Sequence, residues 1–399
     1  MATTILFDLT RLFHRVRRPN CSGIDRVLLE QAQHFHALNE VTFCAWSGHE
    51  LRRVPPWLSN LLLDHLTHRW QSGRRRKRGQ AAVPLRWLGT RKAMVNRALS
   101  RVCRPLEFER YVGQRWIYVN VSHQHIDRVA RVKAMAPPES MRTVVMLHDI
   151  MPITHPQFHD DLLGKEFHVA IEQISSSVDL VLTNSQTTSE EIRKYCAQRG
   201  LRSPELQHIL LGGPRREGTR PERPPERATF VCLGTLSERK NIALLGQVWS
   251  RLSAATASPP ELHLVGSPAK GYVAPAVLVD LPHVVWHRSL RDQELRSLLT
   301  CATALLAPSQ AEGFGLPVLE ALAHWVPVIA SDLPAHREVG GDVIEYAAHD
   351  DPSAWELLID AYSAPGSTAR AAQLDRIEAA KLPYWSEHCE FVLKSLREL

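Results

Sequence analysis

Two glutamates, eight residues apart, flank the turn whose residue types are best suited to chemistry. Glu312 and Glu320 lie in the stretch Pro-Ser-Gln-Ala-Glu-Gly-Phe-Gly-Leu-Pro-Val-Leu-Glu-Ala at 308–321. An apolar run precedes this stretch, so we predict a strand, a glycine-rich loop and a helix that begins near Leu316. Exposed backbone N–H groups at a helix start attract anions. The spacing therefore predicts a site for a long ligand with hydroxyl groups on both sides of a phosphate.

Two further loops carry matching residue types directly after apolar runs. The sequence Gly-Thr-Leu-Ser-Glu-Arg-Lys-Asn at 234–241 contains Arg239 and Lys240, two cations suited to neutralising a diphosphate. The sequence Leu-Val-Gly-Ser at 264–267 ends a strand in a turn of small residues, where Gly266 gives a ligand close access to the backbone.

The elements that must position these loops follow from the alternation of apolar runs with segments of helical spacing. We expect strands at 5–9, 116–121, 143–148, 180–183, 229–233, 262–265, 284–286, 304–306 and 326–330. We expect helices at 23–38, 164–178, 242–252, 292–301 and 316–324, and one that opens near Ser189 as its N-cap. This order predicts an α/β fold with parallel sheets that are covered by helices on both faces.

The alternation is interrupted once, in a stretch rich in proline and glycine at 212–227. We therefore predict two doubly wound, Rossmann-like domains that face a cleft. Their expected bounds are 1–212 and 228–383, with a linker at 213–227 and a final helix at 384–399. In such sheets ligands bind at the carboxyl ends of the strands.

The positive charge is concentrated in one part of the chain. The whole sequence has 48 Lys and Arg against 42 Asp and Glu, a net charge of +6. Residues 65–106 hold twelve of the basic residues and no acidic one, so the remainder has 36 against 42 and a balance of −6. We expect a basic insertion within an acidic protein.

Three interpretations of the basic insertion at 65–106 are open on charge alone: a solvated loop, an anionic membrane surface as partner, or nucleic acid as partner. Interleaved tryptophans and leucines suit the membrane surface. No helix-turn-helix, zinc-finger or RNA-binding signature supports nucleic acid, so we expect no nucleic-acid partner. The seven cysteines are scattered and indicate a reduced, cytoplasmic protein, here expected at the inner face of the membrane.

The motifs resemble those of the family-4 retaining glycosyltransferases, which have the GT-B fold. The resemblance is continuous over about 228–365 and rests on the E-x7-E stretch, G-T-L-x-x-R-K-N and L-V-G-S. In the first half it rests on Ser-Gly-Ile-Asp-Arg at 22–26, His-Asp-Ile at 148–150 and Leu-Thr-Asn-Ser at 182–185. In this fold the final helix usually crosses back to the first domain.

The resemblance implies a role for each matching residue. Glu312, Arg239, Lys240 and His148 would serve catalysis, with Glu312 on the sugar hydroxyls and the two cations on the leaving diphosphate. Gly23 and Arg26 would face the acceptor or a phosphate. The donor would be bound by the following residues: Glu320, Gly313, Phe314, Gly315, Leu316, Gly234, Gly266 and Ser309.

Two positions depart from the family pattern. Trp325 stands where glycine is usual, so we expect the preceding helix to be capped differently. The N-terminal turn has one glycine, Gly23, where many members have two, and this weakens its assignment to a phosphate.

The expected mechanism uses no metal and no cofactor. Metal-dependent glycosyltransferases carry Asp-x-Asp, which the sequence lacks. Pro156 separates His155 from His159 and disfavours a single helical face for metal binding. Arg239 and Lys240, with a helix N-terminus, would stabilise the leaving phosphate instead. Retention without an evident nucleophile predicts attack from the face on which the phosphate leaves.

The resemblance implies transfer of a hexose from a GDP- or UDP-linked nucleotide sugar to a saccharide or lipid-linked acceptor. We favour mannose from GDP-mannose and a growing bacterial surface polysaccharide, such as lipopolysaccharide. Two alternatives remain at this point. One is a sugar synthase or phosphorylase of the same fold that acts on a soluble sugar, and the other is a non-catalytic protein that binds polyanions or membranes.

Overall fold

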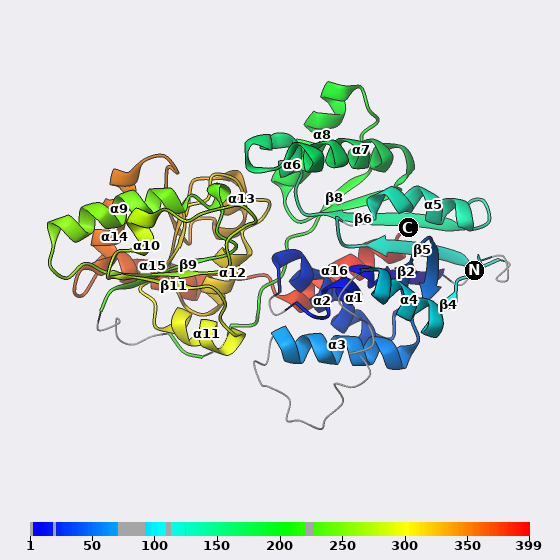
Figure 1. Cartoon of the computed structure of the whole chain (residues 1–399), viewed down its shortest axis with the longest axis horizontal. Coiled ribbons are helices and arrows are strands. Elements are labelled where there is room, and N and C mark those ends of the chain that lie inside the picture. Colours follow the sequence, from blue (N-terminus) through cyan, green and yellow to red (C-terminus); the bar gives the residue numbers. More distant parts are fainter. Residues whose placement is uncertain are drawn as a thin grey trace. The chain divides into compact units, whose positions relative to one another are not determined.

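The chain divides into two compact units, which we describe separately (Figure 1). Unit 1 comprises Met1–Leu211 and Trp385–Leu399, and unit 2 comprises Gly212–Tyr384. The computed structural model describes residues 3–18, 21–70, 92–108, 113–123, 125–216, 218–220 and 227–399. The end of the first segment of unit 1 and the end of unit 2 lie one residue from the expected bounds, whereas unit 2 begins at Gly212 and so includes the stretch that we expected to be a linker.

Unit 1 is built on a sheet that has, among its described residues, eight strands in the order β4-β3-β2-β1-β5-β6-β7-β8. The strands from β2 through β1 to β8 pair in parallel. The strands are β1 (Thr3–Asp8), β2 (Val41–Ser47), β3 (Glu50–Arg53), β4 (Arg104–Pro105), β5 (Arg115–Asn120), β6 (Met141–Leu147), β7 (Leu180–Thr183) and β8 (Leu206–His208). Their continuous apolar runs are buried, as expected for a sheet covered on both faces.

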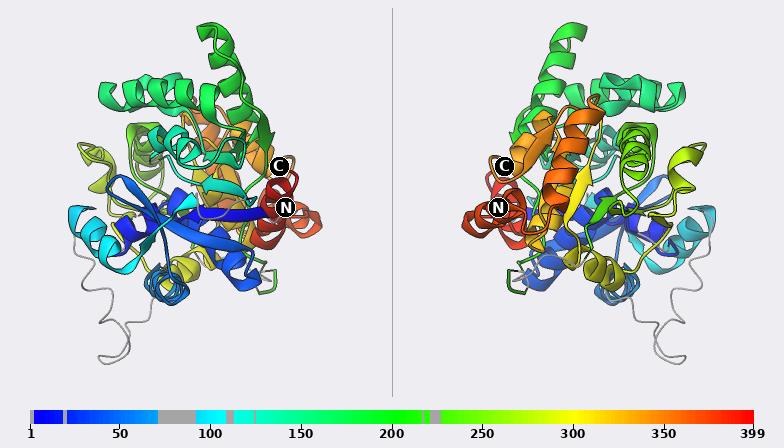
Figure 2. Two further views of the ribbon diagram at one scale, coloured as in Figure 1. Left: turned by 90° about the vertical axis from the view of Figure 1, so that its right-hand side faces the viewer. Right: turned by 90° about the vertical axis from the view of Figure 1, so that its left-hand side faces the viewer.

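Helices connect these strands and cover the sheet. The helices are α1 (Thr10–Arg15), α2 (Gly23–Leu38), α3 (Pro56–Trp70), α4 (Lys92–Val102), α5 (Val129–Met135), α6 (Met151–Thr154), α7 (Asp161–Ser177), α8 (Gln186–Arg199) and α16 (Trp385–Arg397), with short 3-10 turns η3 (Ile126–Arg128) and η4 (Pro156–Phe158). The last of these, α16, packs against α2. Figure 2 draws it in red beside the marked N-terminal end of the chain.

The basic insertion expected at 65–106 is partly built into unit 1. Its first residues complete α3, while its last residues form α4 and the edge strand β4, which pairs antiparallel with β3. Arg69 donates hydrogen bonds to the backbone oxygens of Arg18 and Arg17. The ends of the segment are therefore structural, because their apolar residues are buried against the sheet. Residues 71–91, with the run Arg74–Arg78, lie outside the described residues.

Unit 2 has a parallel sheet of six strands among its described residues, in the order β11-β10-β9-β12-β13-β14. The strands are β9 (Thr229–Leu233), β10 (Glu261–Val265), β11 (Val284–His287), β12 (Ala304–Ala307), β13 (Val328–Ser331) and β14 (Glu345–Ala347). The helices are α9 (Ile242–Ala255), α10 (Ala276–Val279), α11 (Asp292–Thr300), α12 (Leu316–Ala323), α13 (Pro334–Gly340), α14 (Pro352–Ser363) and α15 (Thr368–Ala379), with the 3-10 turn η5 (Glu238–Lys240). The predicted doubly wound α/β class is confirmed for both units.

The described part of the expected linker at 213–227 is hydrogen-bonded to the rest of unit 2. Gly213 forms an isolated parallel bridge with Tyr384. Arg216 donates to the backbone oxygens of Ile377 and Ala380 at 2.7 and 3.1 Å. The composition is that of a loop, but these hydrogen bonds fix the described part of it along unit 2.

Helix α8 begins four residues before the expected position. Ser185, rather than Ser189, is its N-cap, and the Ser185 side chain accepts a hydrogen bond from the Thr188 backbone N–H. Ser189 is buried inside the helix and shares a 2.6 Å hydrogen bond with Thr183. Both serines are of a residue type that is favoured at a helix N-cap. Ser185 is the N-cap because β7 ends just before it, at Thr183.

Trp325 takes the conformation that glycine usually adopts after a helix. Its φ is +61°, and the Val326 N–H donates to the Ala321 oxygen at 2.9 Å. The guanidinium of Arg216 lies 4.7 Å from the centre of the Trp325 ring. The expectation of a different cap is therefore wrong, because the left-handed backbone is kept and a side chain is tolerated there.

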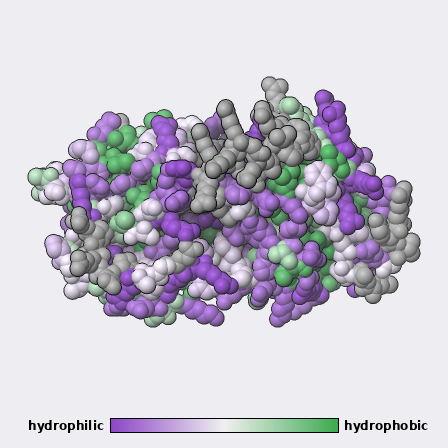
Figure 3. Space-filling view, turned by 90° about the horizontal axis from the view of Figure 1, so that it is seen from below, coloured by the Kyte–Doolittle hydropathy of each residue, from purple (hydrophilic) through white to green (hydrophobic). Residues whose placement is uncertain are grey.

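One face of the described residues is mainly polar. The face drawn in Figure 3 is covered mostly by hydrophilic residues, with hydrophobic ones in small groups. No described helix combines the length and the apolar character that crossing a membrane would require.

We predict that the backbone strain at Trp325 can be measured by comparing two substitutions. Trp325→Ala and Trp325→Gly both remove the ring, but only glycine adopts a positive φ without a steric cost. The glycine variant should therefore be more stable than the alanine variant by about 1 kcal/mol. Urea unfolding of both proteins tests this, and equal stability would show that the site is not strained.

Candidate functional site

The carboxylate of Glu312 lies between two cations at one edge of the unit 2 sheet. Its Oε2 is 2.9 Å from Nη1 of Arg239, and its Oε1 is 2.5 Å from Nζ of Lys240. The hydroxyl of Ser309 donates to Oε1 at 2.8 Å. Only 10% of the Glu312 side chain is exposed. The structure thus brings together four residues that the sequence predicted for one site.

Two neighbouring strands position this cluster. Glu312 and Ser309 follow β12, and the two cations lie in η5, which follows β9. Because β9 and β12 pair in parallel, their carboxyl ends meet at the same edge of the sheet. The backbone N–H of Gln310 donates to the Arg239 oxygen at 2.8 Å and joins the two loops.

Charge pairing decides the ionisation of Glu312. Burial by itself raises the pKa of this carboxyl, but the nearby cations Arg239 and Lys240 outweigh burial and lower it below its ordinary value. Glu312 is therefore ionised at neutral pH. Two cations against one carboxylate leave the cluster with an excess positive charge, which suits an anionic ligand.

Two glycines let the loops approach closely. Gly234 has a φ of +136°, and a Cβ there would lie 3.1 Å from Cε of Lys240. Gly266 has a φ of +143°, and a Cβ there would lie 1.9 Å from the Gly234 oxygen. A side chain at Gly266 is excluded for this reason. These glycines hold the β9 and β10 loops together, a role in addition to the predicted contact with a ligand.

The other predicted donor residues surround the start of α12. Gly315 is the N-cap with a φ of +104°, and Leu316 is the first helical residue, as expected. Gly313 and Phe314 precede them in the loop, and the Phe314 side chain is buried. Glu320 lies one turn into α12 and is partly buried. The contacts of Glu320 and Gly313 with a donor remain predictions.

His336 belongs to the cluster and was not predicted from the sequence. It is buried in α13, donates from Nδ1 to the Ser331 oxygen at 2.8 Å, and would meet a Cβ on Gly315 at 3.1 Å. Burial lowers the pKa of His336, although the charge of Glu312 opposes this decrease. His336 lines a cavity of about 10 Å³ with Lys240 and Glu312, too small for more than about one water. The only sequence signal was its place in the segment that follows the strand ending at Ser331.

In unit 1, His148 is buried at the carboxyl end of β6. Its Nε2 donates to the Val121 oxygen at 3.0 Å, and its backbone N–H donates to Nε2 of His123 at the same distance. Burial lowers the pKa of His148 to about 3, and His123 adds to the decrease. The ring is therefore neutral, and its Nδ1 carries a lone pair. A catalytic role for His148 remains a prediction.

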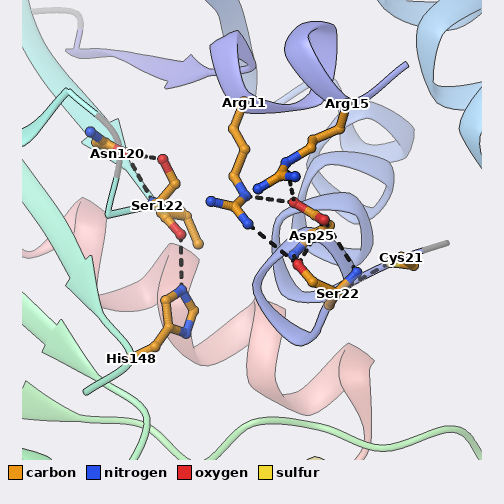
Figure 4. Close-up of polar contacts among 9 residues, drawn as sticks. Arg11, Arg15, Cys21, Ser22, Asp25, Asn120, Ser122 and His148 are labelled. Atoms are coloured by element: carbon orange, nitrogen blue, oxygen red, sulfur yellow. Dashed lines mark hydrogen bonds and ion pairs between the residues drawn. The ribbon is translucent and has the colours of Figure 1, made fainter. Parts of the chain in front are cut away.

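The turn that begins α2 contains a buried ion pair that the sequence reasoning missed. Asp25 accepts from Nε of Arg11 at 2.5 Å, lies 3.7 Å from Nε of Arg15, and forms a capping box with Ser22 (Figure 4). The Arg11 and Asp25 side chains are 8% and 1% exposed. The predicted Gly23 is the exposed first residue of α2, between the two residues of the capping box, and its contact with an acceptor or a phosphate remains a prediction.

Arg26, the other predicted residue here, is partly buried on α2, and its backbone N–H donates to the Ser22 oxygen at 2.9 Å. Figure 4 shows Arg11 between Asp25 and the strand end that carries Asn120 and Ser122. The structure thus places Arg11, which the sequence reasoning did not single out, in the ion-pair network at this strand edge. The signal for Arg11 was its position three residues after the end of an apolar strand.

No group of three or more His, Cys, Asp or Glu within the described parts of the chain has an arrangement that could hold a metal ion. His155 and His159 lie at the two ends of the 3-10 turn η4, as the intervening proline suggested.

Glu191 on α8 faces the strand end that carries His148. Burial, together with the charge of Asp149, raises the pKa of Glu191 to about 7, against an ordinary value near 4.3. Asp149 accepts a 3.1 Å hydrogen bond from the Met151 N–H. A carboxyl that retains its proton up to neutral pH was not predicted from the sequence.

Comparison with known structures identifies the fold. The chain aligns over its full length with sucrose-phosphate synthase from Thermosynechococcus elongatus (TM-score 0.64, 15% identity, 99% of that chain). It also aligns over its full length with Anabaena HepE, solved in complex with UDP and glucose (TM-score 0.65, 16% identity, 100% of that chain). The protein therefore has the GT-B fold.

The sequence comparisons identify the domain that carries the Glu312 cluster. Residues 227–361 match the family described as Glycosyl transferases group 1, so the chain contains a glycosyltransferase domain. The Escherichia coli serotype-specific mannosyltransferase WbdA is 22% identical over 69% of this chain and 36% of its own length. The Escherichia coli O-antigen chain mannosyltransferase B is 28% identical over 52% of this chain and 57% of its own length. The chain thus matches about a third to somewhat over half of the length of these relatives.

The raised pKa of Glu191 predicts a dependence of stability on pH. In the folded protein this carboxyl keeps its proton up to about pH 7, whereas in the unfolded chain it loses the proton near pH 4.3. The free energy of unfolding should therefore fall as pH rises between these values. Glu191→Gln should remove this loss and gain about 1–2 kcal/mol over wild type between pH 5 and pH 8, after allowance for solvent screening.

Urea unfolding at the two pH values measures this difference. Glu190→Gln changes the exposed neighbouring acid on the same helix and is the matched control. The same pH dependence in wild type and Glu191→Gln would show that Glu191 titrates normally.

Proposed function

We propose that this protein is a retaining, metal-independent glycosyltransferase that moves a hexose from a nucleotide sugar to a growing bacterial surface polysaccharide. The observation that carries the proposal is the buried cluster of Arg239, Lys240 and Glu312 at the carboxyl ends of β9 and β12. Its excess positive charge lies beside the glycine-rich start of α12. Cations and the backbone N–H groups of a helix start at one point are what a leaving diphosphate requires.

The reaction breaks the bond between the anomeric carbon and the phosphate oxygen, and the electron pair leaves with that oxygen. Arg239 and Lys240 stabilise the negative charge that develops on the diphosphate. The acceptor hydroxyl forms the new bond to the anomeric carbon on the face from which the phosphate departs. Its proton passes to the leaving phosphate, so the products are the lengthened saccharide and a nucleoside diphosphate.

Glu312 has two tasks in this mechanism. Its charge holds the two cations in place, and in the presence of a donor the carboxylate accepts hydrogen bonds from sugar hydroxyls. Glu320, eight residues later on α12, binds the ribose of the nucleotide. The neutral His148 in unit 1 has an Nδ1 lone pair that accepts a hydrogen bond from the acceptor.

The names of the relatives favour mannose as the sugar and an O-antigen-like polysaccharide as the acceptor. WbdA is named as a mannosyltransferase. Mannosyltransferase B and the Salmonella typhimurium RfbU are named as O-antigen chain mannosyltransferases, the last at 44% identity over 66 residues. GDP-mannose is then the first donor to test, and UDP-sugars follow. The Mycolicibacterium smegmatis relative named alpha-maltose-1-phosphate synthase, at 25% identity, supports the alternative of a soluble sugar acceptor.

We further propose that unit 1 meets an anionic membrane surface, where a lipid-linked acceptor is available. Helix α4 buries Val95, Ala98 and Leu99. It exposes three cations, Lys92, Arg97 and Arg101. Met94 on the same helix is 50% exposed. Basic residues with an exposed apolar side chain suit the interface of acidic lipids.

Donor turnover tests the proposed activity. The purified protein should release nucleoside diphosphate from one member of a panel of GDP-, UDP- and dTDP-sugars, and faster with acceptor. Lys240→Met should lower kcat/KM by at least 100-fold, as loss of one charge-stabilising donor does. Lys381→Met, an exposed lysine of the same unit, is the control. Failure of every donor, with and without oligosaccharide or phosphorylated sugar acceptors, would contradict the proposal.

Vesicle binding tests the membrane surface. A Lys92→Gln, Arg97→Gln, Arg101→Gln variant should lose at least tenfold in partitioning onto vesicles that contain phosphatidylglycerol, because each charge contributes about 1 kcal/mol. Nucleotide affinity should not change. A Lys165→Gln, Arg193→Gln, Arg202→Gln variant removes three exposed charges elsewhere in unit 1 and is the control. Equal co-sedimentation of both variants would exclude α4 as the contact.

A further inference from the structure

A cavity of about 260 Å³ lies in unit 1, far larger than the ~15 Å³ that one water needs. It is lined by the first residues of β1 and β5, by the turn before β6 and by the end of α16. It therefore lies at the amino ends of the parallel strands, at the opposite edge from His148. Neither the motifs of the sequence nor the Glu312 cluster involves this part of the fold.

Strand register explains how the cavity is formed. Ile5, Ile117 and Arg142 are cross-strand partners in β1, β5 and β6, so they form one row on the same face of the sheet. Thr3 and Arg115 form the next row toward the amino ends. Leu396 of α16 lines the cavity as well. The floor is apolar, and the rim is polar and open to solvent.

Three arginines and two glutamates stand among the described residues that line the cavity. Arg397 is paired with Glu40 at 2.6 Å, and Arg142 is paired with Asp179 at 3.1 Å. Arg115 is exposed and, within the described part of the chain, has no ion pair. Its guanidinium offers a planar set of N–H donors that matches a carboxylate or phosphate.

The remaining acid, Glu139, differs from Arg115 in its position. Arg115 projects from a strand row that faces the cavity. Glu139 is exposed in the turn before β6, and its φ is +62°. Its backbone is held there because the next residue, Ser140, accepts a 2.7 Å hydrogen bond from the Trp116 N–H. Arg115 is therefore better placed than Glu139 to contact a ligand that lies on the apolar residues of the cavity.

We propose that this cavity binds a small amphiphilic anion. The apolar body of the ligand lies on Ile5, Ile117 and Leu396, and its carboxylate or phosphate monoester is held by Arg115. Because the floor joins the sheet to the last turn of α16, the bound ligand also fastens this helix to unit 1. The proposal is independent of glycosyl transfer, since it involves the other edge of the sheet.

Calorimetric titration with four probes of equal chain length tests the proposal: octanoate, octyl phosphate, octanol and octylammonium. At least one of the two anions should bind, and the pair shows whether a carboxylate or a phosphate is preferred. Octanol and octylammonium should bind at least tenfold more weakly than the better anion. Amide hydrogen exchange in the last turn of α16 should slow in the presence of that anion.

Two variants assign the binding to this cavity. Arg115→Gln should lower the affinity for the better anion at least tenfold and leave the affinity for octanol unchanged. Arg53 is an exposed arginine on a strand of the same sheet, and Arg53→Gln should change neither affinity. Thr3→Phe fills the rim and should abolish binding of every probe, and its melting curve shows whether it folds.

Three results would overturn the proposal. The first is equal affinity for octanol and the anions, and the second is tighter binding of octylammonium, which would assign recognition to Glu139. The third is the absence of heat and of slowed exchange with either anion at millimolar concentration.

Discussion

The arrangement of unit 2 depends on one buried carboxylate. An ionised glutamate that is removed from water is costly unless cations and hydrogen-bond donors compensate it, and Arg239, Lys240 and Ser309 do so for Glu312. Removing both cations would leave a buried charge without an ionic partner in this cluster. The loops after β9 and β12 are therefore held to each other by charge as well as by backbone hydrogen bonds. The same pairing leaves one positive charge in excess, which is what an anionic leaving group needs.

Close backbone contact makes this pairing possible. A Cβ on Gly266 would collide with the Gly234 oxygen, and one on Gly234 would press on the Lys240 side chain. Lys240 can lie close to the end of β9 because Gly234 lacks a side chain. Trp325 shows the opposite case, because a bulky residue occupies a left-handed position and is covered by Arg216. The segment that contains Arg216 thereby becomes part of unit 2, although its composition is that of a linker.

A buried ion pair also lies in unit 1, at the start of α2. Asp25 caps its own helix through Ser22 and pairs with Arg11, so a buried charge again joins two elements. His148, by contrast, is kept neutral by burial and is oriented by the Val121 carbonyl. The carboxyl edge of this sheet thus combines a compensated ion pair, neutral imidazoles and a glutamate with a raised pKa. The amino edge carries the cavity near Arg115.

The fold class and most of the Glu312 cluster could be predicted from the sequence, because apolar periodicity and the spacing of Glu312 and Glu320 are local properties. Local rules could not choose between Ser185 and Ser189 as N-cap, since both satisfy them and the position of β7 decides. His336 and Arg11 were missed because their importance comes from contacts with residues 21 and 14 positions away. Only the tertiary structure placed those groups together, set the pKa values of His148 and Glu191 through burial, and left the cavity beneath α16. These properties depend on burial by side chains that are distant in the sequence, and a local sequence pattern does not predict which side chains those are.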